Sequence, residues 1–168
     1  MIAAFAALDA KVKVPLQFLL GGGGAMVLAY QFPVATQDLD AILIKSTLTE
    51  GDIHSEIQEV ATELALPKDW LNPYFGTFLF TLPKTYADRL KNVFSGQFIF
   101  VEALGKEDLL VLKCFAGRDK DISHAMALLK KGANIDFVET HLRALVDLRI
   151  PGAQAACDFF DDLVDSLP

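Results

Sequence analysis

The spacing of apolar residues changes along the chain and predicts two kinds of structure. The first hundred residues carry short apolar runs that end at glycine or proline, which is typical of strands joined by turns. From Glu107 onward the apolar residues recur every three to four positions, which is typical of amphipathic helices. The sequence therefore predicts an α+β fold, in which helices pack on a small mixed β-sheet and the C-terminal half is helical.

The same pattern sets the expected boundaries of the elements. Strands are expected at 17–21, 38–45, 77–82 and 97–104, and helices at 1–13, 24–31, 50–65, 85–94, 107–116, 121–131, 136–147 and 152–165. No repeat or linker interrupts the pattern. We expect one domain over 1–168, with an α/β core at 1–105 and a helical part at 106–168.

Composition narrows the class of protein. Of the 168 residues 52% are hydrophobic, yet no apolar run reaches the roughly 20 residues that cross a bilayer. The N-terminal segment lacks the basic region that opens a signal peptide, so a cytoplasmic protein with no membrane partner is expected. Cys114 and Cys157 lie far apart and are expected as reduced thiols in the core.

Charge is distributed unevenly along the chain. The formal net charge of −7 argues against an extended nucleic-acid-binding surface. Acidic residues gather in the tail at 157–168, whereas basic residues gather at 106–131. The second segment is a candidate anion-binding region, with a solvated helical face as the alternative.

Two acids stand two residues apart in an apolar run that has the pattern of a strand. Asp38 and Asp40 are expected on one face of it, with Cα atoms roughly 6.5–7 Å apart. Carboxylates held this close favour a shared hard cation with oxygen ligands, such as Mg²⁺ or Mn²⁺, which takes further ligands from water and phosphates. The alternative is a pair of exposed acids at the end of a strand.

Four consecutive glycines, at 21–24, precede the acids by one short helix. A glycine turn after a strand lets backbone N–H groups approach a phosphate, and the N-terminus of the next helix adds a favourable dipole. The alternatives are close packing of a helix on the sheet and a plain turn. Neither the Walker pattern nor the dinucleotide-binding fingerprint is present.

The stretch LLGGGGAMVLAYQFPVATQDLDAILI at 19–44 resembles the opening of the nucleotidyltransferase superfamily of polymerase-beta-like fold. More narrowly, it is similar to the bacterial branch that contains the AbiEii-type toxins and their uncharacterised relatives. The shared pattern is a glycine pair, about a dozen residues and an Asp-x-Asp strand. Thr36, DWLN at 69–72 and EDLLVLKCFAGRDKDI at 107–122 also resemble family blocks, so the likeness covers residues 15 to about 130.

The resemblance implies roles for the first block. Asp38 and Asp40 would bind Mg²⁺ (or Mn²⁺) and act in catalysis. Gly23 and Gly24, with Thr36, would hold the phosphates of an NTP. By the same alignment the two preceding glycines, 21 and 22, are expected at the end of the strand.

The resemblance also implies a third carboxylate on a neighbouring strand, acting as the base. The pattern FIFVE places Phe98, Phe100 and Glu102 on one strand face, so Glu102 is the candidate. The alternative is a solvated glutamate at the end of a strand.

A second block, around the predicted break at Gly117, carries further charged residues. Lys113, Arg118 and Lys120 would bind phosphate, and Lys113 with Asp121 would take part in catalysis. The alternatives are a snorkelling lysine, plain surface charges and, for the aspartate, a helix cap. Relatives often carry another aspartate three residues later, where this chain has His124.

The resemblance implies a Mg²⁺-dependent enzyme that transfers a nucleoside monophosphate from an NTP to a hydroxyl acceptor on a protein, a tRNA or a small molecule. It also suggests toxin-like activity with an antitoxin partner. One alternative is a catalytically degenerate binding or regulatory module that keeps the fold. Another is a structural protein that forms homo-oligomers through its apolar surface.

Overall fold

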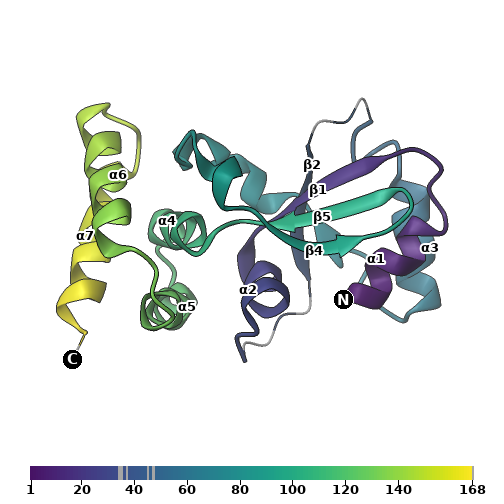
Figure 1. The fold of residues 1–168 in the computed structure, drawn as a ribbon, viewed down its shortest axis with the longest axis horizontal. Helices are drawn as coiled ribbons and strands as arrows, with labels where there is room; N and C mark the ends of the chain where they lie inside the picture. Colours follow the sequence, from purple (N-terminus) through teal and green to yellow (C-terminus); the bar gives the residue numbers. More distant parts are fainter. Residues whose placement is uncertain (34–35, 37, 45, 47, 168) are drawn as a thin grey trace. The chain divides into compact units, whose positions relative to one another are not determined.

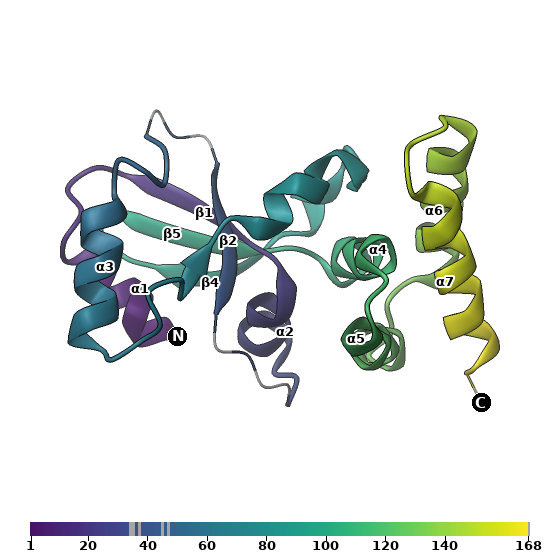
Figure 2. The same cartoon turned by 180° about the vertical axis from the view of Figure 1, so that it is seen from behind.

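The computed structural model describes residues 1–33, 36, 38–44, 46 and 48–167. The fold is α+β, with a five-stranded mixed sheet and a helical C-terminal half, as the sequence predicts (Figures 1 and 2). The chain divides into two compact units, Met1–Gly76 with Leu90–Leu104, and Thr77–Arg89 with Gly105–Pro168. None of the helices described is long and apolar enough to cross a membrane.

The first unit contains the sheet, whose strand order is β3-β2-β1-β5-β4. The strands are β1 (Leu16–Leu20), β2 (Leu39–Ile44), β3 (Leu71–Asn72), β4 (Lys91–Ser95) and β5 (Ile99–Ala103). The central strand β1 pairs antiparallel with β2 and parallel with β5, while β3 is parallel to β2 and β4 antiparallel to β5. Residue 45, the last of the strand predicted at 38–45, lies outside the described residues.

Two helices, α1 (Ile2–Asp9) and α2 (Gly22–Tyr30), pack on the same face of the sheet, and α3 (His54–Glu63) packs on α1. Phe5 of α1 is fully buried, and its ring lies 6.3 Å from that of Phe18 and 6.2 Å from that of Trp70. Alternation along β1 turns Gln17 and Leu19 to the opposite face. That opposite face carries the alternate positions of β2, among them Asp40.

Asp9, at the end of α1, holds the turn between β4 and β5. Its carboxylate accepts hydrogen bonds from the backbone N–H groups of Gln97, Phe98 and Ile99, at 3.0, 2.7 and 2.6 Å. A side chain on Gly96 would overlap this carboxylate. Desolvation raises the pKa of Asp9, but the three N–H donors outweigh it and lower the pKa below its ordinary value.

The helix predicted at 85–94 is wrong. Residues Tyr86–Arg89 form one turn of 3-10 helix (η2), and β4 follows as an edge strand paired with β5. The Lys and Asn that suggested a polar helix are exposed side chains of this edge strand. Pairing with a strand that follows in the chain overrode the local preference.

The strand predicted at 77–82 is also wrong, because Tyr74–Thr81 forms a 3-10 helix, η1. A short continuous apolar run does not distinguish strand from helix by its period. The two-residue strand β3 just before η1 falls between the helix predicted at 50–65 and the strand predicted at 77–82, where no element was expected.

The second unit contains four helices, α4 (Lys106–Ala116), α5 (Asp119–Lys130), α6 (Ile135–Asp147) and α7 (Ala153–Asp165). These confirm the four predicted helices, and Gly117 ends α4 in the left-handed region at φ 55°. Cys114 of α4 and Cys157 of α7 are buried free thiols, as expected.

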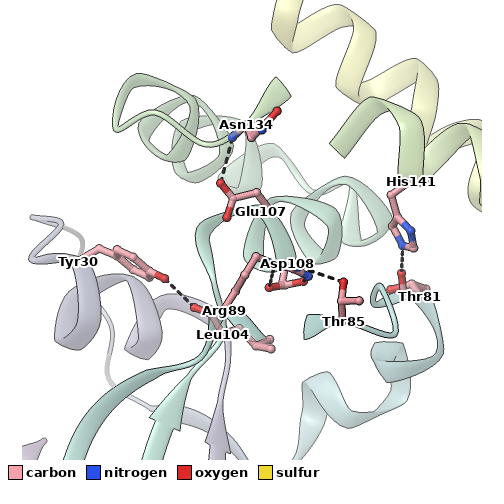
Figure 3. Close-up of polar contacts among 9 residues, drawn as sticks. All are labelled: Tyr30, Thr81, Thr85, Arg89, Leu104, Glu107, Asp108, Asn134 and His141. Atoms are coloured by element: carbon pink, nitrogen blue, oxygen red, sulfur yellow. Dashed lines mark hydrogen bonds and ion pairs between the residues drawn. The ribbon is translucent and has the colours of Figure 1, made fainter. Parts of the chain in front are cut away.

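Polar contacts join the segment Thr77–Arg89 to α4 and α6 within this unit (Figure 3). Arg89 donates from Nε and Nη2 to the fully buried carboxylate of Asp108, at 3.0 and 2.6 Å, and its guanidinium lies over the Phe137 ring. Nε2 of His141 lies 2.7 Å from the carbonyl oxygen of Thr81. Burial raises the pKa of Asp108, although the Arg89 charge opposes this rise.

Candidate functional site

The four glycines connect β1 to α2. The strand ends at Leu20, Gly21 is the N-cap of the helix, and α2 begins at Gly22. The expectation that Gly22 ends the strand is therefore wrong, because Gly22 has φ +56° and begins the helix, whereas Gly21 keeps an extended backbone directly after the strand. The N–H of Gly21 donates to the carbonyl oxygen of Asp40 at 2.8 Å, so the turn is fixed to the strand that carries the acids.

Gly22 touches the carboxylate of Asp40. A β-carbon added to Gly22 would overlap Oδ2 of Asp40, and the left-handed backbone of Gly22 disfavours any side chain. Only glycine fits between the start of α2 and this acid. This contact is separate from the phosphate role that the family resemblance implies for Gly23 and Gly24, which stays a prediction.

The other two glycines have different neighbours. A β-carbon on Gly23 would lie 3.3 Å from Oγ1 of Thr36, whereas one on Gly24 would lie 2.6 Å from the Leu39 side chain. Gly24 therefore allows α2 to pack closely on β2. The N–H groups of this first helical turn have no partner within the helix, and this leaves them suited to an anion.

The two acids differ in position. Asp40 lies within β2 and is partly buried, whereas Asp38 is exposed and precedes the strand, which starts at Leu39 rather than at Asp38 as predicted. Thr36, predicted as a phosphate contact, places its hydroxyl 2.9 Å from the carbonyl oxygen of Asp38 and 3.3 Å from Oδ1. The structure thus gives Thr36 a contact with the acid itself.

Asn72 is a site residue that the sequence analysis did not single out. It is aligned with Asp40 in the β2–β3 pairing, and its Nδ2 donates to Oδ2 of Asp38 at 3.1 Å. The available signal was the block DWLN, which resembles family relatives but had no role attached to it. The contact joins residues 34 positions apart, so only the fold reveals it.

Glu102 is on the same sheet face as Asp40 but is not close to it. Glu102 is aligned with Leu19 of β1, and Leu19 in turn is aligned with Ile42 of β2, one alternate position from Asp40. Two strand spacings and one two-residue step separate the Cα atoms of the two acids by on the order of 12 Å. The Glu102 carboxylate accepts a 2.6 Å hydrogen bond from Gln17, which lies farther from the glycine turn.

The second unit contains a cluster of buried charges at the α4–α5 junction. Nζ of Lys113 lies 2.7 Å from Oδ1 of Asp121, and Nε of Arg118 lies 2.6 Å from Oδ2. Lys113 is 6% exposed and Asp121 is completely buried. Burial raises the pKa of Asp121, but hydrogen bonds from the two cations outweigh it and keep the pKa below its ordinary value.

Two neighbours complete this cluster. Lys120 is exposed, while Nδ1 of His124 is buried and has no hydrogen-bond partner among the residues that the structure describes. Burial and the charge of Lys113 lower the pKa of His124, which favours a neutral imidazole. Asp121 is therefore held by two cations at once.

The donor set around the glycine turn fits a magnesium ion. Among the described residues no three His, Cys, Asp or Glu side chains come together as a metal site. Mg²⁺ is often held by one or two carboxylates and completes its shell with waters and substrate phosphates. Asp38 and Asp40, beside a helix N-terminus that can receive those phosphates, match this requirement.

Comparison with known proteins gives a family. Residues 2–147 match the model of a family described as "Nucleotidyltransferase of unknown function (DUF6036)". Since the match covers most of the chain, the protein belongs to this family, and the expectation of a nucleotidyltransferase family is confirmed. Comparisons with curated proteins and with solved structures gave no match.

Proposed function

We propose that this family member transfers a nucleoside monophosphate from an NTP to a hydroxyl acceptor, with Asp38 and Asp40 holding Mg²⁺ or Mn²⁺. One observation carries the proposal: the glycine turn contacts the acidic strand directly, through the Gly21–Asp40 hydrogen bond and the close approach of Gly22. The N-terminus of α2 and the Asp40 side chain therefore meet at one place.

The residues of the first unit can perform distinct tasks there. Asp38 and Asp40 would supply oxygen ligands, and the N–H groups at the start of α2 would donate to phosphate oxygens. A bound Mg²⁺ neutralises charge that develops on the phosphate during in-line attack. Catalysis of this kind depends chiefly on fixed donors and positioning, which the rigid contact of turn and strand supplies.

The charged cluster of the second unit supports binding of an anion. Lys113 and Arg118 share the single buried carboxylate of Asp121, and exposed Lys120 adds a further positive charge. We propose that these cations attract a phosphate group. Asp121 would then act by holding Lys113 and Arg118 in place.

The acceptor hydroxyl would belong to a protein side chain, a tRNA or a small molecule. A toxin-like role with an antitoxin partner follows from the family resemblance of the glycine and Asp-x-Asp block, and is part of the same proposal. The formal net charge of −7 favours an acceptor recognised locally over one bound along an extended basic surface.

Transfer of label tests the proposal. The full chain is incubated with each α-labelled NTP, Mg²⁺ or Mn²⁺ and cell extract, and we expect labelled protein, RNA or small molecule. Asp38→Asn and Asp40→Asn should abolish labelling while circular dichroism stays unchanged. Asp165→Asn, which neutralises an exposed acid at the end of α7, should label like the wild type.

A catalytically degenerate module is the second candidate. The observation that favours it is that Glu102 is bonded to Gln17, away from the acid pair. Such a module would bind NTP, seen as a thermal shift, without transferring label from any nucleotide. Label transfer that depends on Asp38 would exclude it.

A further inference from the structure

We infer that Asn72 is a positioning residue that holds the carboxylate of Asp38 in the orientation that binds the metal ion. This inference rests on the proposed metal site and adds a residue to which no role has been assigned. The geometry that supports it involves the placement of β3, the orientation of the Asn72 amide and the hydrogen bonds around Asp38.

The position of Asn72 is set by its neighbours in β3. Trp70 is 2% exposed, donates from Nε1 to the carbonyl oxygen of Ile57 at 3.0 Å, and accepts from the N–H of Leu39 at 2.7 Å. This anchors the start of β3 to both α3 and β2. The aligned pair of Asp40 and Asn72 then turns the Asn72 side chain toward the face that carries the acids.

The orientation of the amide is fixed from the other side. The backbone N–H of Tyr74 donates to Oδ1 of Asn72 at 3.1 Å, in the turn that leads into η1. Since an N–H donor must face the amide oxygen, the amide nitrogen faces Asp38. Nδ2 donates there to Oδ2 at 3.1 Å, so Asn72 is a donor to the acid and its oxygen is not directed at the metal.

Asp38 has a donor near each of its carboxylate oxygens. Asn72 donates to Oδ2 at 3.1 Å, while the Thr36 hydroxyl, which lies 2.9 Å from the Asp38 carbonyl oxygen, shares its one proton with Oδ1 at 3.3 Å. An exposed aspartate that precedes a strand would otherwise sample several rotamers. One donor on each oxygen restricts the carboxylate and leaves lone pairs for a cation, which is how outer-shell groups orient metal ligands.

Binding of Mn²⁺ to the full chain tests the inference without relying on turnover. The EPR signal of free Mn²⁺ gives the dissociation constant for the wild type and for Asn72→Ser. The serine hydroxyl can still accept from the N–H of Tyr74 but is too short to reach Asp38. We expect Mn²⁺ binding to weaken about 10-fold to 100-fold, with an unchanged metal-free melting temperature.

The matched control is Asn92→Ser, because Asn92 is also a strand asparagine whose amide donates to a neighbouring side chain, at 2.8 Å to Ser95. It should bind Mn²⁺ like the wild type. If label transfer is detected, Asn72→Ser should raise the Mn²⁺ concentration needed for half-maximal rate and recover at saturating Mn²⁺. A purely structural role would not produce that recovery.

The outcomes separate the inference from the proposed function. If the wild type binds Mn²⁺ and Asn72→Ser binds it equally well, the positioning role is overturned and the metal site stands. If Asn72→Ser unfolds, a second variant, Thr36→Val, serves instead, because it removes the donor near Oδ1. Unchanged Mn²⁺ affinity in Thr36→Val likewise overturns the view that such donors orient Asp38. A wild type that binds no Mn²⁺ overturns both the metal site and the inference.

Discussion

Lys113 and Asp121 form an ion pair of 2.7 Å in which neither side chain is more than 7% exposed. Removing one partner of a buried pair leaves an uncompensated charge in the interior and costs roughly 3–5 kcal/mol. We expect Asp121→Asn to lower the free energy of unfolding by about this amount, because Lys113 then has no counter-charge. Urea denaturation followed by circular dichroism measures the loss.

Arg118 provides the control for this prediction. Its side chain is 44% exposed, and replacing it leaves Asp121 paired with Lys113, so no buried charge loses its last partner. Arg118→Gln should lower the free energy of unfolding by less than about 1 kcal/mol. Equal losses for the two variants would contradict the view that burial decides the effect.

Asp9 makes stability depend on pH. Its folded pKa lies below its ordinary value, so its carboxylate contributes stability above the unfolded pKa, roughly 3.9, and this contribution is lost as the pH falls through the folded pKa. Asp9→Asn should lower the free energy of unfolding by about 1–2 kcal/mol at pH 7. Urea denaturation at pH 7, 5 and 3 should show this difference shrinking only below about pH 4. A difference that is constant over the whole range would refute the role of ionisation.

Gly22 is the glycine for which we expect the largest effect. Gly22→Ala places a methyl group on the Asp40 carboxylate and costs roughly 1–2 kcal/mol for the left-handed backbone alone. We expect a clearly lowered melting temperature and lost Mn²⁺ binding. Gly51→Ala is the control, since the nearest atom to its β-carbon would lie at 3.4 Å, an ordinary contact.

Replacing Glu102 shows whether its carboxylate acts as a catalytic base or only forms a structural hydrogen bond. Because its carboxylate is bonded to Gln17, and Asp40 is two strands away, we expect Glu102→Gln to reduce label transfer less than about tenfold. A general base would lose roughly 10²–10⁴-fold on this change. A loss of that size would show that Glu102 is the catalytic base.

The C-terminal helices could be predicted because their apolar spacing, and glycines such as Gly117 and Gly132 at their ends, are local signals. The acid pair and the glycine turn were visible for the same reason. The placement of Gly22 at the end of the strand failed, since the start of the turn depends on where the pairing of β1 with β2 stops. That boundary is set by tertiary structure.

Long-range pairing accounts for the remaining errors. Residues 91–95 form the strand β4 because they pair with β5, which follows in the chain. The strand β3 has only two residues, which is too short to show an alternation of apolar and polar side chains. The contact of Asn72 with Asp38 likewise depends on a strand pairing across many residues. Lys113 had two sequence interpretations, solvent or ligand, and the structure shows a third, the buried carboxylate of Asp121.

The glycine turn at 21–24 also affects the unfolded chain. Glycine loses more backbone freedom on folding than alanine, by roughly 0.5–1 kcal/mol each, so ordering the four glycines costs about 2–4 kcal/mol more conformational entropy than ordering four alanines would. This is a large fraction of the roughly 5–15 kcal/mol that keeps a typical domain folded. A ligand that binds only the folded turn shifts the equilibrium back by mass action. The nucleotide and the metal proposed to bind this turn would therefore raise the free energy of unfolding.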